Sequence, residues 1–293
     1  MAFRVLTRNA THDQPGRPHR LATMKTEVVG YGGTRIGLWV EGAENTRPIV
    51  FVHGWAQSSR AWAPQLADPA LSERFRLVAM DLRGHGDSEV PSAGYDDPRV
   101  WAEDLASVLD FAGEDAIVVG WSYGGLVITD YLRVHGSSRL SGVVFVGAIT
   151  EIGKNRPGGK VGPAMRDAIP AVLSDDPAVA IPALVQFSAR MTTAPVSGTL
   201  TQSLLGACLS TPPAVRSALF RRDVGSEDVL RDLDKPALIV HGLADAVIDP
   251  TAAEYAAGKI QGAVVRWLPE VGHLPFAEAA DEFGELLRGF ADQ

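Results

Sequence analysis

The amino-acid sequence predicts an α/β fold: a doubly wound, mostly parallel sheet that carries a helical cap insertion. Short β-like runs alternate with helical stretches along most of the chain, a pattern typical of strand–helix–strand units with right-handed crossovers. Residues 49–52 and 117–119 are continuously apolar, which indicates strands buried on both faces of a sheet. One proline-rich block interrupts the alternation and predicts the insertion.

Eight segments are predicted to form the strands, because each is rich in apolar, β-branched or aromatic residues. They are residues 27–31, 36–41, 49–53, 77–81, 116–121, 142–148, 237–241 and 264–269. Five further segments are predicted to form helices, on the basis of their length and of apolar residues at helical spacing. They are residues 60–66, 99–111, 124–134, 251–259 and 277–290.

The chain is expected to divide into a tail, a two-part core and a cap. Residues 1–25 contain several arginines and prolines but not the apolar run that a secretory signal requires. We therefore expect a disordered tail there. The α/β core is assigned to residues 26–149 and 233–293. Residues 150–232 hold eight prolines and no convincing buried strand, which predicts a cap of small helices between two core strands.

The composition excludes several classes of protein. Hydrophobic residues make up 46% and charged residues 21% of the 293 residues, as in an ordinary globular protein. The formal net charge of −8 argues against a nucleic-acid partner, which needs a basic face. Cys208 is the only cysteine, so no internal disulfide can form, and no apolar stretch is long enough to span a membrane. We therefore expect a soluble, cytoplasmic protein, and its oligomeric state stays open.

A candidate nucleophile, Ser122, lies in the sequence Gly-Trp-Ser-Tyr-Gly-Gly at residues 120–125. This sequence follows a predicted buried strand and precedes a predicted helix. In that position a Gly-x-Ser-x-Gly sequence makes a sharp turn that exposes the serine hydroxyl above the edge of the sheet. The glycines leave room for the turn, and the start of the helix favours negative charge nearby. Ser122 is therefore the predicted nucleophile.

A serine hydroxyl needs a base, and His273 is the predicted one. It lies in a loop after the last predicted strand, where its ring is free to approach Ser122. His53 and His241 instead end buried strands, so we expect them to pack or to fix loops. Asp245, just after the seventh predicted strand, is predicted to orient the imidazole.

Two further assignments leave alternatives. Asp249 is the other candidate carboxylate, but an Asp before Pro250 at the start of a predicted helix is typical of an N-cap. Two backbone N–H groups are expected to form the oxyanion hole, those of Tyr123 and of Trp55 in the loop after the third predicted strand. Ordinary loop packing is the alternative interpretation of Trp55.

Together these segments resemble the α/β-hydrolase superfamily. The resemblance covers about residues 27–149 and 233–293, where five short motifs follow one another in the family's order. They are Phe-Val-His-Gly-Trp at 51–55, Asp-Leu-Arg-Gly-His-Gly-Asp-Ser at 81–88, the serine motif at 120–125, His-Gly-x-x-Asp at 241–245 and Gly-His at 272–273. The resemblance implies that Asp81 and Arg83 belong to a structural loop. Dehalogenases and epoxide hydrolases of this fold carry Asp in place of Ser122, which argues against those activities.

The predicted function is hydrolysis of a small-molecule carboxylic ester through a Ser-His-Asp triad and an acyl-enzyme, with no metal or organic cofactor. Apolar side chains of the cap are expected to line the substrate pocket, and the candidates are Phe187, Met191, Leu205, Leu209 and Phe220. Other chemistry on the same triad stays open: perhydrolysis or other acyl transfer, lactone hydrolysis and carbon–carbon bond hydrolysis. A small-ligand receptor is the alternative from a different class.

Overall fold

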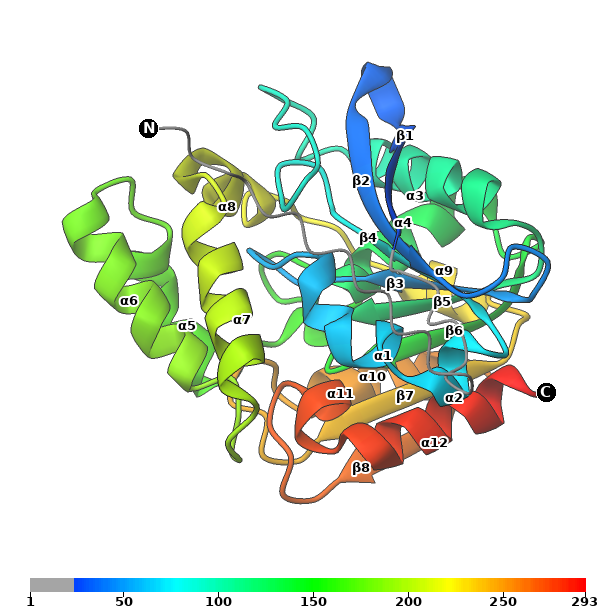
Figure 1. Ribbon diagram of the computed structural model, residues 1–293. Helices are drawn as coiled ribbons and strands as arrows, with labels where there is room; N and C mark the ends of the chain where they lie inside the picture. Colours follow the sequence, from blue (N-terminus) through cyan, green and yellow to red (C-terminus); the bar gives the residue numbers. More distant parts are fainter. Residues whose placement is uncertain (1–23) are drawn as a thin grey trace, which may run out of the picture.

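The computed structural model describes residues 24–293 and contains one large sheet with helices around it (Figure 1). The predicted tail lies mostly outside the described residues. Met24 and Lys25 are the exception, because they open the first strand, which pairs with its neighbour along its whole length. The strand therefore begins three residues earlier than its first predicted residue.

The predicted sheet is confirmed: eight strands lie in the order β1-β2-β4-β3-β5-β6-β7-β8. β1 and β2 run antiparallel to their neighbours, and the other pairs are parallel. The strands are β1 (Met24–Val29), β2 (Arg35–Glu41), β3 (Pro48–Val52), β4 (Arg76–Met80), β5 (Ala116–Trp121), β6 (Leu140–Val146), β7 (Ala237–Gly242) and β8 (Val264–Leu268). Each lies within three residues of its predicted bounds. In the buried strands of the centre, the apolar runs end where the chain leaves the sheet.

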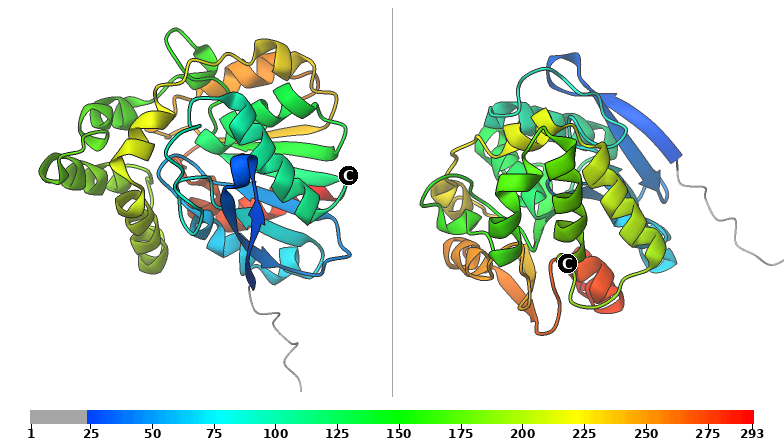
Figure 2. Two further views of the ribbon diagram at one scale, coloured as in Figure 1. Left: turned by 90° about the horizontal axis from the view of Figure 1, so that it is seen from above. Right: turned by 90° about the vertical axis from the view of Figure 1, so that its left-hand side faces the viewer.

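Helices cover both faces of the sheet (Figures 1 and 2). One face carries α3 (Pro98–Ala112), α4 (Tyr123–His135), α9 (Glu227–Arg231) and α10 (Thr251–Lys259). The other carries α1 (Ala63–Leu66), α2 (Pro69–Ser72), α11 (Pro275–Glu278) and α12 (Ala280–Ala291). Short 3₁₀ turns η1 (Tyr31–Gly33) and η2 (Ser59–Trp62) complete the core. None of the helices in residues 24–293 has the length and apolar composition needed to cross a bilayer.

Most of the chain between β6 and β7 forms a group of helices at one side of the sheet (Figure 1). They are α5 (Pro163–Val172), α6 (Pro177–Ala189), α7 (Gly198–Ser210) and α8 (Pro213–Leu219). The 3₁₀ turn η3 (Pro157–Gly159) precedes them and contacts α10, and α9, which follows them, lies on the face of the sheet described above. No strand forms in this part of the described chain, although two isolated β-bridges link Ile152 with Val224 and Val161 with Ile248. Below, "the cap" means residues 150–232.

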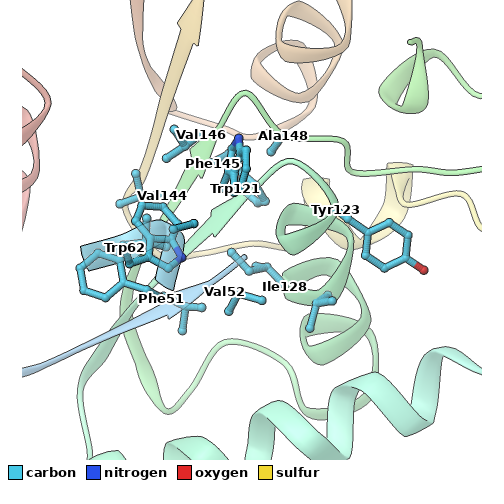
Figure 3. Packing of buried hydrophobic residues seen from close by; sticks show 14 of the residues in the cluster. Phe51, Val52, Trp62, Trp121, Tyr123, Ile128, Val144, Phe145, Val146 and Ala148 are labelled. Atoms are coloured by element: carbon cyan, nitrogen blue, oxygen red, sulfur yellow. The ribbon is translucent and has the colours of Figure 1, made fainter. Parts of the chain in front are cut away.

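Aromatic side chains fill the core beneath the central strands (Figure 3). The ring of Trp62 lies 4.9 Å from that of Phe51 and 4.4 Å from that of Phe276, and Phe276 in turn packs 5.1 Å from Trp121. Trp62 and Trp121 are fully buried. Strand β5, which leads directly to Ser122, is therefore packed tightly against its surroundings.

Asp81 and Arg83 lie in the loop after β4, and the family resemblance implies a structural role for them. The carboxylate of Asp81 accepts hydrogen bonds from the backbone N–H groups of Ser59 (2.6 Å) and Asp87 (2.9 Å). Arg83 donates two hydrogen bonds to the carboxylate of Asp104 on α3, at 2.6 and 2.7 Å, and both side chains are buried. These contacts tie the loop after β4 to η2 and α3.

Candidate active site

Ser122 occupies the sharp turn between β5 and α4. Its backbone has φ 55° and ψ −118°, a conformation that costs free energy in a residue with a side chain. The motif's glycines are needed here: a Cβ on Gly124 would lie 2.4 Å from the carbonyl oxygen of Val52, and one on Gly120 would lie 2.7 Å from the backbone of Gly124. The strained turn is thus held in place by close contact with β3.

His273 and Asp245 form a buried pair at the ends of β8 and β7. The imidazole Nδ1 lies 2.7 Å from Oδ2 of Asp245. The other carboxylate oxygen accepts hydrogen bonds from the backbone N–H groups of Val247 (2.8 Å) and Ile248 (3.0 Å). Its own loop therefore fixes Oδ1 of Asp245, and Oδ2 faces the imidazole.

The loop that carries His273 is held by groups that the sequence analysis did not identify. The carboxylate of Glu278 accepts hydrogen bonds from the backbone N–H groups of Gly272 and Leu274, both at 3.1 Å, on either side of the histidine. The backbone N–H of His273 itself donates to the carbonyl oxygen of Met191 in the cap, at 2.7 Å. The position of the imidazole thus depends on the start of α11 and on the main chain of the cap.

Asp249, the alternative carboxylate, is engaged elsewhere. Its side chain accepts hydrogen bonds from the backbone N–H (3.0 Å) and the hydroxyl (2.6 Å) of Thr251, in the first turn of α10. It also lies 3.3 Å from the ammonium group of Lys160. The N-cap of α10 is Pro250, so Asp249 stands one residue before the capping position predicted for it and binds the first turn from there. Asp245 is the carboxylate in contact with His273.

The backbone N–H groups of Trp55 and Tyr123 are available as donors. Within residues 24–293 neither of them donates a hydrogen bond. The Trp55 loop is pressed against the nucleophile, since a Cβ added to Gly54 would lie 2.9 Å from the Cβ of Ser122. Unpaired N–H groups beside a nucleophile are what an oxyanion hole requires.

The Trp55 side chain contacts the cap. Its indole N–H donates to the carbonyl oxygen of Arg216 at 3.1 Å. Its ring meets Phe187 and Phe220 edge-on, with centroids 5.9 and 5.6 Å apart. The Trp55 loop, which supplies one candidate oxyanion donor, is therefore packed against α6, α8 and the residue that follows α8.

Tyr123 belongs to a buried polar cluster, and its ring points away from Trp62 and Trp121 (Figure 3). Arg222 donates to the Tyr123 hydroxyl (2.9 Å) and to the carboxylate of Asp130 (2.6 Å), and the arginine and aspartate side chains are fully buried. Burial raises the pKa of Asp130 to about 6 and the pKa of Tyr123 to about 12. Because the two sides of the ion pair lie 92 residues apart in the chain, no local pattern could reveal it.

Burial disfavours the charged form of the other buried histidines near the site. Burial lowers the pKa of His53 to about 4 and the pKa of His85 to about 3. Nε2 of His53 accepts a hydrogen bond from the backbone N–H of Leu82 at 3.0 Å, and Nδ1 lies 2.8 Å from the carbonyl oxygen of Gly54. His53 therefore fixes the loops after β3 and β4, as its position at a strand end predicts. Burial also lowers the pKa of His241, which lies 3.4 Å from Asp245.

A narrow cavity of about 10 Å³ lies beside Ser122 and His273, with about the room needed for one water molecule. Its remaining walls come from the Trp55 loop, β5, the cap and the loop after β7. They are Gly54, Trp55, Gln57, Trp121, Met165, Phe187, Met191 and Val247. Among residues 24–293 no three His, Cys, Asp or Glu side chains are grouped as metal ligands.

The cavity includes some of the predicted pocket residues and leaves out others. Phe187 and Met191 line it. Phe220 does not line it but packs against Trp55, which does. The placement of Leu205 and Leu209 was wrong: neither lines the cavity, and Leu209 is 42% exposed. Helix α7 instead buries Leu204 and Cys208, the residues one position earlier.

That error has a physical cause. Helix α7 contains no charged residue that would mark its outer face, so its apolar residues alone could not fix its rotation. Gln57, Met165 and Val247 were not predicted. Gln57 is two residues beyond Trp55, and this proximity to the oxyanion loop was the one signal that could have identified it.

Comparisons with known proteins agree with this geometry. The crystal structure of the esterase RhEst1 from Rhodococcus sp. ECU1013 superposes with a TM-score of 0.87 and 44% sequence identity, covering 92% of this chain and 98% of that one. A pimeloyl-[acyl-carrier protein] methyl ester esterase from Neisseria meningitidis is 27% identical over 84% of this chain and 94% of its own. A non-heme haloperoxidase from Rhodococcus erythropolis is also 27% identical, over 84% of this chain and 92% of its own. The sequence model of the Alpha/beta hydrolase family matches residues 49–286, and this chain belongs to that family.

Proposed function

We propose that the chain is a carboxylic-ester hydrolase that works through Ser122, His273 and Asp245. The observation that supports it most strongly is the 2.7 Å contact between Nδ1 of His273 and Asp245 beside a serine held at φ 55°. A carboxylate bound to Nδ1 leaves Nε2 of the imidazole free to take a proton from the serine hydroxyl. The similarity to proteins described as esterases supports the same reaction class.

In the first half of this reaction, Oγ of Ser122 attacks the ester carbonyl carbon and its proton passes to Nε2 of His273. The carbonyl oxygen becomes an oxyanion, which accepts hydrogen bonds from the N–H groups of Trp55 and Tyr123. The C–O bond to the alcohol then breaks, and His273 returns the proton to the leaving alkoxide. The products are the free alcohol and an acyl group bound to Ser122.

In the second half, water attacks the acyl carbonyl and its proton passes to His273. The second oxyanion collapses, the bond to Ser122 breaks, and the protonated imidazole returns the proton to Oγ. Asp245 stays ionised throughout and stabilises the imidazolium that forms twice in each cycle. No step uses a metal ion or an organic cofactor.

We further propose that the small-molecule ester binds against the apolar wall formed by Trp55, Phe187 and Met191, with Met165 and Val247 completing it. The cavity is small, so the acyl or alcohol group next to the carbonyl is compact or the cap moves on binding. The cytoplasmic location is a prediction that rests on the sequence alone.

The proposal is tested by trapping the acyl-enzyme. With p-nitrophenyl butyrate, rapid mixing should release close to one p-nitrophenol per enzyme molecule before the steady rate, provided that deacylation is the slower step. Mass spectrometry of the quenched enzyme should find a butyryl group on the peptide that contains Ser122. An active enzyme that carries the acyl group elsewhere, or a chain that hydrolyses no ester in a broad panel, would contradict the proposal.

Perhydrolysis is the second candidate, and the haloperoxidase relative is the observation that favours it. Here hydrogen peroxide replaces water in the second half of the reaction and the product is a peracid. The two reactions compete for one acyl-enzyme, so the ratio of peracid to acid formed at several peroxide concentrations measures the preference directly.

A further inference from the structure

Gln57 is the one polar side chain in the cavity wall outside Ser122, His273 and the two tryptophans. It is 2% exposed and follows the oxyanion loop by two residues. The indole N–H groups of the two tryptophans are already paired: Trp55 donates to the carbonyl oxygen of Arg216, and Trp121 donates to that of His273. The polar atoms of Gln57 are therefore the remaining side-chain groups that could recognise a substrate.

The contacts of the Gln57 amide fix its orientation. Nε2 donates to the carbonyl oxygen of Leu204 at 3.4 Å and to the sulfur of Cys208 at 3.0 Å. A backbone carbonyl can only accept, so the amide nitrogen must be the atom that faces α7. Oε1 is consequently directed away from α7.

Oε1 of Gln57 is a buried acceptor with no hydrogen-bond partner within residues 24–293. An amide oxygen kept from water without a donor costs free energy, and most buried acceptors in folded proteins are paired. The other polar side chains of the wall are already paired or take part in the proposed reaction, so a donor group on a bound molecule can supply the missing partner. An apolar group in the same place leaves the oxygen unpaired.

We propose that Oε1 of Gln57 accepts a hydrogen bond from a donor group of the substrate, so that the enzyme prefers esters with a hydroxyl or amide N–H close to the ester bond. This inference rests on the proposed ester hydrolysis. The small cavity favours a compact donor such as a hydroxyl within two carbons of the ester group. The donor can belong to the acyl part or to the alcohol part of the ester.

Pairs of esters that differ by a hydroxyl in place of a methyl group test this directly. In the acyl arm, p-nitrophenyl 3-hydroxybutyrate is compared with p-nitrophenyl 3-methylbutyrate. In the alcohol arm, 2-hydroxyethyl butyrate is compared with propyl butyrate. The quantity measured is the ratio of kcat/KM for the hydroxyl ester to kcat/KM for its methyl partner.

We expect the wild-type ratio to exceed 1 in at least one arm, and Gln57→Leu to lower it about 3- to 10-fold there, the range of one neutral hydrogen bond. Gln57→Met, which is more flexible, provides a second variant in case the first does not fold. Gln65→Leu is the matched control: Gln65 is 3% exposed, donates to the carbonyl oxygen of Phe276 and has an unpaired Oε1, but it does not line the cavity. That variant should leave the ratio unchanged.

The outcomes separate the two proposals. A ratio that Gln57→Leu leaves within twofold of wild type in both arms overturns the assignment. So does an equal loss of kcat/KM for both members of each pair, which would mean that the glutamine supports the cavity or orients the attacking water. If the wild-type enzyme hydrolyses none of the four esters, the proposed ester hydrolysis itself has failed.

Discussion

Replacing Asp245 by asparagine should abolish turnover and leave the fold intact. Oδ1 of Asp245 accepts two backbone N–H groups, so only an oxygen can occupy that position. In Asp245→Asn the amide oxygen must stay there, and the NH₂ group must face Nδ1 of His273, 2.7 Å away. The imidazole then accepts at Nδ1 and carries its proton on Nε2, where it cannot take another from Ser122.

The expected loss follows from this tautomer. When the orienting carboxylate of a serine–histidine pair becomes an amide, kcat falls by about 10⁴, which corresponds to roughly 5 kcal/mol in the barrier. The substitution preserves the volume and both N–H contacts of Oδ1, so the free energy of unfolding should change by less than about 1 kcal/mol.

The assay is steady-state hydrolysis of p-nitrophenyl butyrate beside urea unfolding, with Asp249→Ala as the comparison. Losing the contact of Asp249 with the first turn of α10 should lower the free energy of unfolding by about 0.5–2 kcal/mol and leave kcat nearly unchanged. An Asp245→Asn enzyme that keeps a tenth of the wild-type kcat, or an Asp249→Ala enzyme that is inactive, would refute the assignment.

Three further predictions concern the nucleophile, acid stability and the cap. Ser122→Ala should lower kcat on the order of 10⁴-fold or more and should not react with a fluorophosphonate probe, which labels the wild-type serine. The pKa of His53 in the folded protein, about 4, lies below its unfolded value of about 6.5, so the stability it contributes is present above pH 6.5 and is lost as the pH falls towards 4. At pH 5 this loss is about 2 kcal/mol, and the pH dependence of urea unfolding should be weaker in His53→Gln. Phe187→Ala should alter the relative kcat/KM of acetyl, butyryl and hexanoyl esters by about 1–3 kcal/mol, while Leu209→Ala, on an exposed position, should not alter it.

The sheet was predictable because its signal is local. Buried parallel strands appear as continuous apolar runs, and β5 and α10 begin and end at the predicted residues. The α/β interpretation needed only these runs and the helical spacing between them. The exception is β1, whose alternating exposure gives a weaker signal and whose first residues were assigned to the tail.

The three residues of the candidate triad could be predicted because each lies in a loop that follows a strand. The order of Ser122, Asp245 and His273 along the chain anticipates their positions at the ends of β5, β7 and β8. Contacts between distant segments were not predictable, because no local pattern encodes them. The hydrogen bond of Gln57 to Cys208 spans 151 residues, and the uncharged faces of α7 gave no indication of which apolar residues turn inward.

The cap anchors the loops of His273 and Trp55 through main-chain carbonyl oxygens. The loop of His273 and the indole of Trp55 are anchored by the carbonyl oxygens of Met191 and Arg216, which every amino acid can supply. The Met191 side chain can therefore be exchanged without removing its anchor. The buried guanidinium of Arg216 cannot be treated in the same way, because it donates to the carbonyl oxygens of Val172, Cys208 and Thr211 and so helps to hold the cap. A designer could diversify the lining of the cavity residue by residue, whereas an insertion or deletion that shifts either carbonyl would disturb the loop of His273 or the loop of Trp55.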